Sequence, residues 1–354
     1  MLFRSFTVNA MAVALPLEAA RPIVDPSNGI DDLRAQVLRT PIEAQQSFSD
    51  DPLRMLRAAR FAAQLGFMVE ATTLKAITQM TARLEIISAE RIRDELTKLM
   101  VAPDPRLGLA MLVETGMAER VLPEVARLRD TVDEHRRHKD VYVHTLTVLE
   151  QAIQLEADGP DFVLRMAALL HDIGKPKTKS VDPDGKVSFH HHEVVGASMT
   201  KTRLSALRYP KDVIEDVSRL VELHLRFHGY SGGTWTDAAV RRYVRDAGPL
   251  LERLHRLTRS DCTTRNVRKA AALASAYDSL EARIAELAER ENLASIRPEL
   301  DGNEIMSELG LPPGPQVGEA YRYLLELRME RGPMGRDEAV VALRDWAAQR
   351  GLGT

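Results

Sequence analysis

Side chains that can bind a divalent metal are spread over separate helix-like segments between positions 144 and 261. They are His144, His171, Asp172, His192, His224 and Asp261. A metal centre needs several ligand atoms around one point, so a chain that uses these residues has to fold the segments into one bundle. The adjacent pair His171-Asp172 is the most informative part of the set, because it ends an apolar helical run just before Gly174 and Pro176.

A structural alternative exists for each of these residues taken alone. A single histidine in an amphipathic helix is more often a hydrogen-bonded core residue than a ligand, and the dipeptide His-Asp is common. The whole ordered set favours metal binding over that alternative. A divalent metal lowers the pKa of the water that it binds and neutralises charge on a phosphate ester, so the set predicts metal-dependent phosphate chemistry. Imidazole ligands favour Ni, Co, Mn or Zn, while carboxylate oxygens leave room for Mg.

The composition is that of a globular protein with about two to four domains, since 354 residues exceed one ordinary core. The single cysteine, Cys262, cannot form an internal disulfide, and only 5% aromatic residues argue against binding of single strands by base stacking. The net charge of -3 neither requires nor excludes nucleic acid. No apolar run approaches the length of a membrane span, and polar residues interrupt the N-terminal stretch that resembles a signal peptide, so we expect a cytoplasmic protein.

Helical spacing dominates the chain from Ser49 onward, which makes the predicted fold mainly α. Residues 1–45 read instead as short strands and turns, with a loop over 23–33 and a strand over 37–40. The clearest helices after Ser49 are predicted near 71–80, 88–101, 106–116 and 117–121, and one long helix is predicted over 249–290.

A second group of candidate residues lies in the segment SDDPLRMLRAARF, where Asp51 precedes arginines at every third position: Arg54, Arg57 and Arg60. Asp51 is the predicted N-cap of this helix, Pro52 its first residue and Gly66 its end. A carboxylate beside a guanidinium can match the hydrogen-bonding edge of a base, and further arginines can hold a triphosphate. A capped helix with a solvated arginine face explains the same spacing, and the residues alone favour that alternative.

The metal-ligand pattern resembles the HD phosphohydrolase superfamily, in which the ordered set H…HD…D binds one metal and additional histidines bind a second. The core set is matched by His144, His171, Asp172 and Asp261, and the additional pair by His192 and His224. His192 is preferred over His190 and His191 because it precedes Glu193, as in the family's pattern. The resemblance implies catalytic roles for His171, Asp172 and Lys175, although Lys175 in HDIGKP is equally well explained as a surface lysine.

The arginine segment resembles the EDxxR block, EDPLRxLRAxRFAAxLGF, of class II CCA-adding tRNA nucleotidyltransferases and bacterial poly(A) polymerases. Further blocks resemble the same family: FTVNAMA its RRDFTxNAxA block, VDPSNGIDDL its DPxGGxxDL block, and DGNEIMSELGLPPGPQVGEAY the tail of its actinobacterial-type members. The resemblance implies tRNA as a partner, CTP and ATP as substrates, and Mg for nucleotidyl transfer. It makes Asp51 and Arg54 the template for the base and sets Arg57 and Arg60 near the phosphates, with Arg4 as the second arginine of the RRD block.

The same resemblance implies four parts in a mainly α, multi-domain protein. They are a short α/β remnant of the nucleotidyltransferase head (1–45), neck and RNA-binding helices (46–130), an HD helical bundle (131–292) and a small helical tail (293–354). The sequence leaves the oligomeric state open, and a homodimer is one option.

Departures from the family pattern lie at the start of the chain. Family members carry a GGxVRD loop and a DxD carboxylate pair before the RRD block, and this sequence contains neither; Ser5 also replaces the aspartate of that block. Two milder departures are Asp50, where Glu is usual, and Asn28, which replaces a glycine. We therefore expect a fragment or a product of a misplaced start. Two other functions stay open: a stand-alone HD phosphohydrolase that acts on nucleotides, 2′,3′-cyclic phosphates or RNA-end phosphates, and a non-catalytic RNA-binding remnant.

This polypeptide of 354 residues is expected to add no nucleotides to tRNA, because two-metal nucleotidyl transfer requires the missing carboxylate pair. The measurement is extension of a tRNA without its 3′ end in the presence of CTP, ATP and Mg²⁺. Robust incorporation of labelled nucleotide would contradict the expectation.

Overall fold

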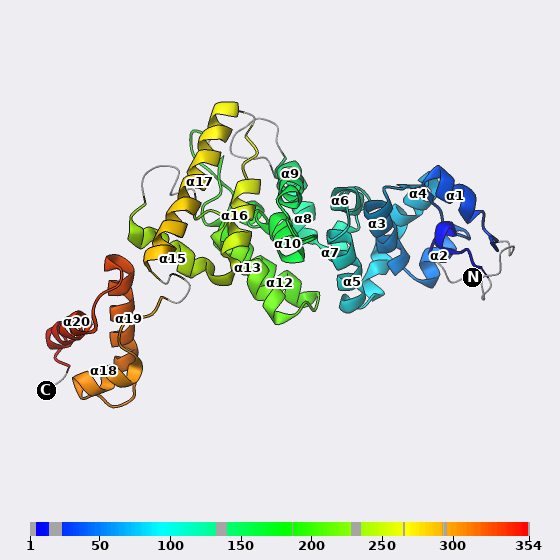
Figure 1. Ribbon diagram of the computed structural model, residues 1–354. Coiled ribbons are helices and arrows are strands. Elements are labelled where there is room, and N and C mark those ends of the chain that lie inside the picture. The colour runs from blue at the N-terminus through cyan, green and yellow to red at the C-terminus, as the bar shows by residue number, and fades with distance from the viewer. Residues whose placement is uncertain are drawn as a thin grey trace. The chain divides into compact units, whose positions relative to one another are not determined.

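The computed structural model describes residues 5–13, 23–131, 140–185, 187–227, 235–264, 266–291, 293 and 296–352 (Figure 1). These residues are mainly helical, as predicted, and the strands among them form two small two-stranded sheets. The chain divides into two compact units: Met1–His224 with Arg256–Thr263, and Leu225–His255 with Thr264–Thr354. The division into four parts made from the sequence stays a prediction.

The start of the first unit differs from the strands and loop predicted for residues 1–45. Thr7–Asn9 form a 3-10 turn, η1, and the predicted loop over 23–33 contains most of helix α1, Gly29–Ala35. The carboxylate of Asp25 accepts hydrogen bonds of 2.7 and 2.9 Å from the first two backbone N–H groups of α1. Because these donors have no partner within the helix, the carboxylate stabilises its first turn. The sequence of this segment is typical of a turn, so the helix was not predicted.

The helices predicted near 71–80, 88–101, 106–116 and 117–121 are present, whereas the helical elements over 44–50, 81–86 and 123–130 were not predicted. The strand predicted over 37–40 is present as β1, Val37–Leu38, which pairs in parallel with β2, Met68–Val69. The helices and 3-10 turns are α2 (Ala44–Asp50), α3 (Leu53–Leu65), α4 (Ala71–Met80), η2 (Thr81–Ile86), α5 (Ala89–Met100), α6 (Pro105–Glu114), α7 (Ala118–Val121), α8 (Pro123–Ala126) and η3 (Arg127–Asp130).

Helix α3 carries the arginine segment and packs through its apolar side, which comprises Leu53, Leu56, Ala59 and Ala63. Gly66 ends the helix in the left-handed region at φ 69°, as predicted. The helix begins at Leu53, one residue later than predicted, and Oδ1 of Asp51 accepts a 3.3 Å hydrogen bond from the backbone N–H of Leu53. Helix α6 crosses α3 closely at Gly108, where an added Cβ would lie 2.7 Å from the backbone oxygen of Ala59.

A helical bundle in the first unit carries five of the six predicted metal ligands, all except Asp261. Its elements are α9 (Val141–Gln154), α10 (Phe162–Leu170), α11 (Lys175–Thr178), the antiparallel hairpin β3 (Ser180–Val181) and β4 (Val187–Ser188), α12 (His192–Ala206) and α13 (Lys211–Leu223). Helix α10 packs against α9 and α13, and α13 packs against α12 (Figure 1). Residues 164–170 of α10 are all buried, so the end of this helix, where the His-Asp pair follows, lies inside the bundle.

The prediction of one long helix over 249–290 is wrong, because the helix is interrupted at the predicted ligand Asp261. Its elements are η4 (Gly248–Leu250), α16 (Leu251–Ser260) and α17 (Val267–Arg290). Asn266 starts the second helix, since its side-chain oxygen accepts a 3.1 Å hydrogen bond from the backbone N–H of Lys269. The break leaves Asp261 just beyond the end of α16, where its side chain reaches His144.

Arg165 on α10 joins the bundle to the end of α5. Its Nη2 lies 2.7 Å from Oε2 of Glu156, which follows α9, and the two side chains are 4% and 6% exposed. The same guanidinium donates 2.8 Å hydrogen bonds to the backbone oxygens of Met100 and Ala102. Because the last carbonyl groups of a helix lack partners within it, these bonds fix the end of α5 against α10.

The second unit is also helical, with α15 (Asp237–Ala247), α17, α18 (Gly302–Leu309), α19 (Pro315–Arg331) and α20 (Arg336–Gln349). Helices α18, α19 and α20 enclose an apolar core that includes Leu300, Ile305, Leu324, Leu343 and Trp346. Within the described ranges, no helix combines the length and the apolar character needed to cross a membrane.

Candidate metal centre

The six predicted metal ligands lie in the first unit, on or next to five helices, and five of the six lie at a helix end. His144 is on α9, His171 and Asp172 follow α10, His192 begins α12, His224 follows α13 and Asp261 follows α16. Helix ends bring backbone and side chains from different elements close together without interrupting the helices themselves. The arrangement explains how residues so distant in sequence meet in one place.

Close packing of two backbone segments positions His192. A Cβ added at Gly174 would lie only 2.1 Å from the backbone oxygen of His192 and 2.8 Å from the backbone nitrogen of Gly196. No side chain fits in that space, so the turn after Asp172 rests directly on the first turn of α12. As a result, Nε2 of His192 lies 3.2 Å from Oδ1 of Asp172.

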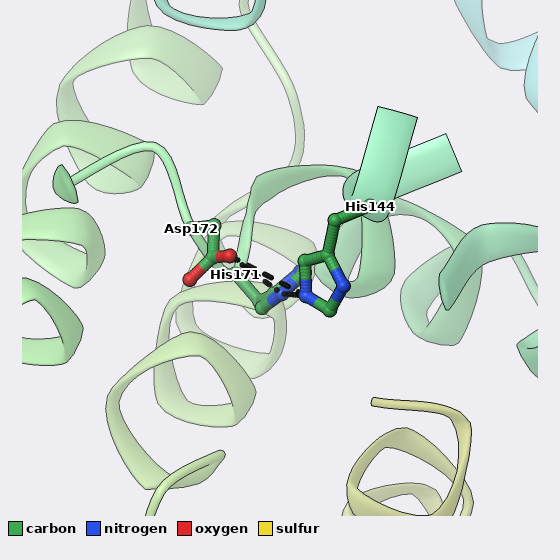
Figure 2. Close-up of side chains that lie close together, drawn as sticks. All are labelled: His144, His171 and Asp172. Carbon is green, nitrogen blue, oxygen red and sulfur yellow. Dashed lines mark hydrogen bonds and ion pairs between the residues drawn. The ribbon is translucent and has the colours of Figure 1, made fainter. Parts of the chain in front are cut away.

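One set of ligand atoms comprises His144, His171, Asp172 and Asp261. Nε2 of His144 lies 3.4 Å from Nε2 of His171 and 3.6 Å from Oδ2 of Asp172. Oδ1 of Asp261 lies 3.0 Å from Nε2 of His144 and 3.7 Å from Nε2 of His171. Figure 2 shows the two rings meeting beside the carboxylate of Asp172. Ligands roughly 2 Å from one metal lie roughly 3 Å from each other, so these separations suit a single cation.

A second set comprises Asp172, His192 and His224, whose ligand atoms lie within 4.8 Å of one another. The Nε2 atoms of His192 and His224 are buried and make no hydrogen bond, although that of His192 is near Asp172. A buried polar atom without a partner costs about 1–3 kcal/mol, and a bound metal would supply the partner. The residues present therefore fit a divalent metal at both sets.

Three of the histidines are oriented by backbone carbonyl groups that are close to them in the sequence. Nδ1 of each lies within hydrogen-bond distance of the carbonyl oxygen three residues earlier, at 2.9 Å for His171, 2.8 Å for His192 and 2.6 Å for His224. A carbonyl oxygen can only accept, so Nδ1 carries the proton and Nε2 presents its lone pair to the centre. For His171 and His224 the carbonyl belongs to the last turn of the preceding helix, where carbonyl groups have no internal partner. For His192 it belongs to Phe189, just before α12.

Burial and charge together set the pKa values of the centre. Burial alone would lower the pKa of His171, but the carboxylates of Asp172 and Asp261 outweigh it and raise the pKa to about 9. Burial, together with the charge of His171, lowers the pKa of His224 to about 3. Burial opposes ionisation of Asp172 and Asp261, yet the facing imidazoles hold the pKa of both carboxyl groups below the usual range. The charged carboxylates favour a cation, which would replace the proton on His171.

The centre is most accessible beside His144 and Asp261, whose side chains are 13% and 17% exposed, compared with 2% or less for His171 and Asp172. Lys175 is also 13% exposed, with Nζ 2.8 Å from Oδ2 of Asp172 and 5.6 Å from the ring centre of Phe189. Its ammonium group therefore lies beside the ligands. The two histidines that precede His192 in the sequence, His190 and His191, are exposed.

The two residues of the predicted base template are joined through the backbone, where the N–H of Arg54 donates a 3.1 Å hydrogen bond to the carbonyl oxygen of Asp51. The side chain of Asp51 pairs with Arg91 of α5, at 3.0 Å. Arg54 is buried and donates hydrogen bonds of 3.1 and 2.9 Å to the backbone and side-chain oxygens of Ser47. Arg4, the remaining predicted residue near the nucleotide, lies outside the described residues.

Arg57 and Arg60 are brought together by one carboxylate. The Nε atoms of both arginines face Glu95 of α5, at 3.2 Å for Arg57 and 2.6 Å for Arg60. The predicted solvated arginine face is therefore partly an ion-pair network between α3 and α5. Sequence reasoning missed Glu95 and Arg91, although their spacing of four residues is a signal that both occupy one face of a helix.

Sequence profiles of two known families match this chain, and together they define a helical HD-domain protein with an RNA-binding region. The profile described as the probable RNA and SrmB-binding site of polymerase A matches residues 66–128. The HD-domain profile matches residues 141–291, which include all the predicted metal ligands.

Individual proteins identify the family more closely. The A-adding tRNA nucleotidyltransferase of Deinococcus radiodurans is 36% identical, over 98% of this chain and 78% of its own length. The CC-adding tRNA nucleotidyltransferase of Thermus thermophilus is 33% identical, over 90% of this chain and 72% of its own. The chain belongs to the CCA-adding tRNA nucleotidyltransferase family.

Solved structures of that family share the fold. The Bacillus stearothermophilus CCA-adding enzyme in complex with CTP gives a TM-score of 0.65 at 22% identity, over 99% of this chain and 74% of that one. The Thermotoga maritima CCA-adding enzyme, complexed with tRNA, gives a TM-score of 0.54 at 16% identity, over 98% and 72% of the two chains.

Gly174→Ala is expected to force α12 away from the turn after Asp172, because the added Cβ would overlap the backbone oxygen of His192. We expect a loss of about 1–3 kcal/mol in the free energy of unfolding, with weaker metal binding by the set that contains His192. Denaturant unfolding and calorimetric metal titration measure the two effects. Gly335→Ala is the control, since a Cβ there meets no atom within 4 Å. Equal behaviour of the two variants would contradict the role of the close contact.

Proposed function

We propose that this chain hydrolyses phosphoesters at the His-Asp centre, with a divalent metal held by each ligand set. The observation that carries the proposal is the position of Asp172, whose Oδ2 faces His171 while its Oδ1 faces His192. A shared carboxylate lets two cations lie close together, as suits the attacking and leaving oxygens of a phosphate displacement. Mg, Mn, Ni or Co fits the mixture of nitrogen and oxygen ligands.

The roles of the chain's own residues follow from their positions. The metal, when bound, lowers the pKa of water and neutralises charge on the phosphate. His171 and Asp172 hold it at the buried end of α10, and Asp172 serves both ligand sets. Lys175 is proposed to donate a hydrogen bond to a phosphate oxygen, because its ammonium group lies beside the ligands and Asp172 holds it there.

We further propose that the chain acts on tRNA, with the 3′ end of the RNA as the place of its chemistry. The names of the relatives, A-adding and CC-adding enzymes, and the RNA-binding profile over 66–128 support this role. CTP, ATP and Mg are proposed as ligands of this chain, whereas nucleotidyl transfer itself is not proposed for it.

The arginine segment would then bind the nucleotide. Asp51 and Arg54 are proposed to recognise the base, and Arg4, Arg57 and Arg60 to contact phosphates. The contacts of Asp51 with Arg91 and of Arg54 with Ser47 would have to open for such recognition.

His171→Ala and Asp172→Ala are each expected to lower phosphoester hydrolysis more than about 100-fold, because either change removes a ligand that packing holds in place. A suitable panel of substrates comprises a 2′,3′-cyclic nucleotide, a nucleoside monophosphate and a tRNA with a 3′-terminal phosphate. Release of phosphate or opening of the cyclic ester is measured with Mg²⁺, Mn²⁺, Ni²⁺ or Co²⁺.

His190→Ala is the matched control, since His190 is an exposed histidine two residues before His192. It is expected to keep the wild-type rate, and a chelator is expected to stop hydrolysis in the wild type. Hydrolysis that survives both ligand substitutions would rule out this centre as its source.

A further inference from the structure

His144 is held differently from the other three histidines of the metal centre. It lies within α9, where its own backbone N–H donates to the backbone oxygen of Asp140 and the helix uses the nearby carbonyls. A carbonyl oxygen at the end of a helix, which faces the rings of His171 and His224, is therefore not the partner of the His144 ring. Nδ1 of His144 lies instead 3.1 Å from Oγ1 of Thr263, a residue distant in sequence.

Two residues of one short loop contact both ring nitrogens of His144. Oδ1 of Asp261 lies 3.0 Å from Nε2, and Oγ1 of Thr263 lies 3.1 Å from Nδ1. The loop after α16 thus holds the imidazole between a carboxylate on the metal side and a hydroxyl on the opposite side. The side chain of His144 is 13% exposed, so packing restrains its ring less than that of the fully buried His171, at 1%.

We propose that Thr263 is a positioning residue of the metal centre, whose hydroxyl fixes the ring of His144 so that Nε2 faces the ligand set. The inference rests on the proposed metal binding. Oγ1 can accept a hydrogen bond from Nδ1–H, which leaves the lone pair of Nε2 for a metal. A hydroxyl can also donate to Nδ1, so Thr263 holds the ring in either tautomer, whereas a carbonyl holds only one.

The test is the affinity for Mn²⁺, measured by calorimetry in a His224→Ala background so that the set containing His144 is measured alone. Thr263→Val removes the hydroxyl and keeps the branched shape of the side chain. We expect it to weaken Mn²⁺ binding about 10–100-fold, the usual effect of removing a partner of a metal-binding histidine. Thr263→Ser, which keeps the hydroxyl, is expected to restore affinity close to that of the background protein.

Thr264→Val is the matched control, because it removes the adjacent hydroxyl, which accepts a hydrogen bond from the backbone N–H of Asn266. The free energy of unfolding without metal is measured for every variant, and the inference expects it to change little in Thr263→Val. If that variant does not fold, Thr263→Ala replaces it in the same comparison with Thr263→Ser.

The outcomes separate this inference from the proposed function. Equal Mn²⁺ affinity of Thr263→Val and Thr264→Val overturns the role of Thr263 and leaves the hydrolysis intact. A wild-type chain that binds Mn²⁺ and hydrolyses no phosphoester overturns the proposed function, while weaker binding by Thr263→Val still supports the positioning role. A wild-type chain that binds no Mn²⁺ overturns both.

Discussion

The close backbone contact between the turn after Asp172 and the first turn of α12 is the constraint on which the metal centre depends. Only a glycine at 174 permits it, since a Cβ there would lie 2.1 Å from the backbone oxygen of His192. The contact brings the second ligand set against Oδ1 of Asp172, while Oδ2 serves the first. The absence of a side chain at position 174 thus decides whether the carboxylate of Asp172 can face two sets of histidines.

Helix α5 connects this centre with the arginine segment inside the first unit. Glu95, near the middle of α5, faces Arg57 and Arg60 of α3, and Arg165 of α10 binds the carbonyl groups at the end of α5. These contacts involve buried or half-buried charges with partners, and removing one partner from a buried pair commonly costs several kcal/mol. The elements that carry the two groups of predicted functional residues are therefore both joined to α5, α3 by ion pairs and α10 by hydrogen bonds to carbonyl groups.

Sequence reasoning predicted the mainly α fold because the apolar spacing of α3 to α6 is strong, and it correctly ended α3 at Gly66. It predicted a loop in place of α1, because Pro26 and Gly29 are typical of turns and Asp25, which caps the helix, lies four residues before it. It also predicted one helix through Asp261, because composition does not reveal a break at a side-chain contact. The ligand residues could be proposed from their order, with the choice of His192 among three adjacent histidines made from the family's pattern. The role of Thr263 could not, since a hydroxyl two residues after Asp261 has no distinctive pattern.

The most direct test of the shared carboxylate is the number of Mn²⁺ ions bound per chain by the wild type and by His144→Ala, His224→Ala and Asp172→Ala, measured by equilibrium dialysis. We expect two ions for the wild type and one for each histidine variant, because each of these two histidines belongs to one set only. We expect none for Asp172→Ala, since both sets lose a ligand together. Retention of one tightly bound ion by Asp172→Ala would contradict the shared carboxylate.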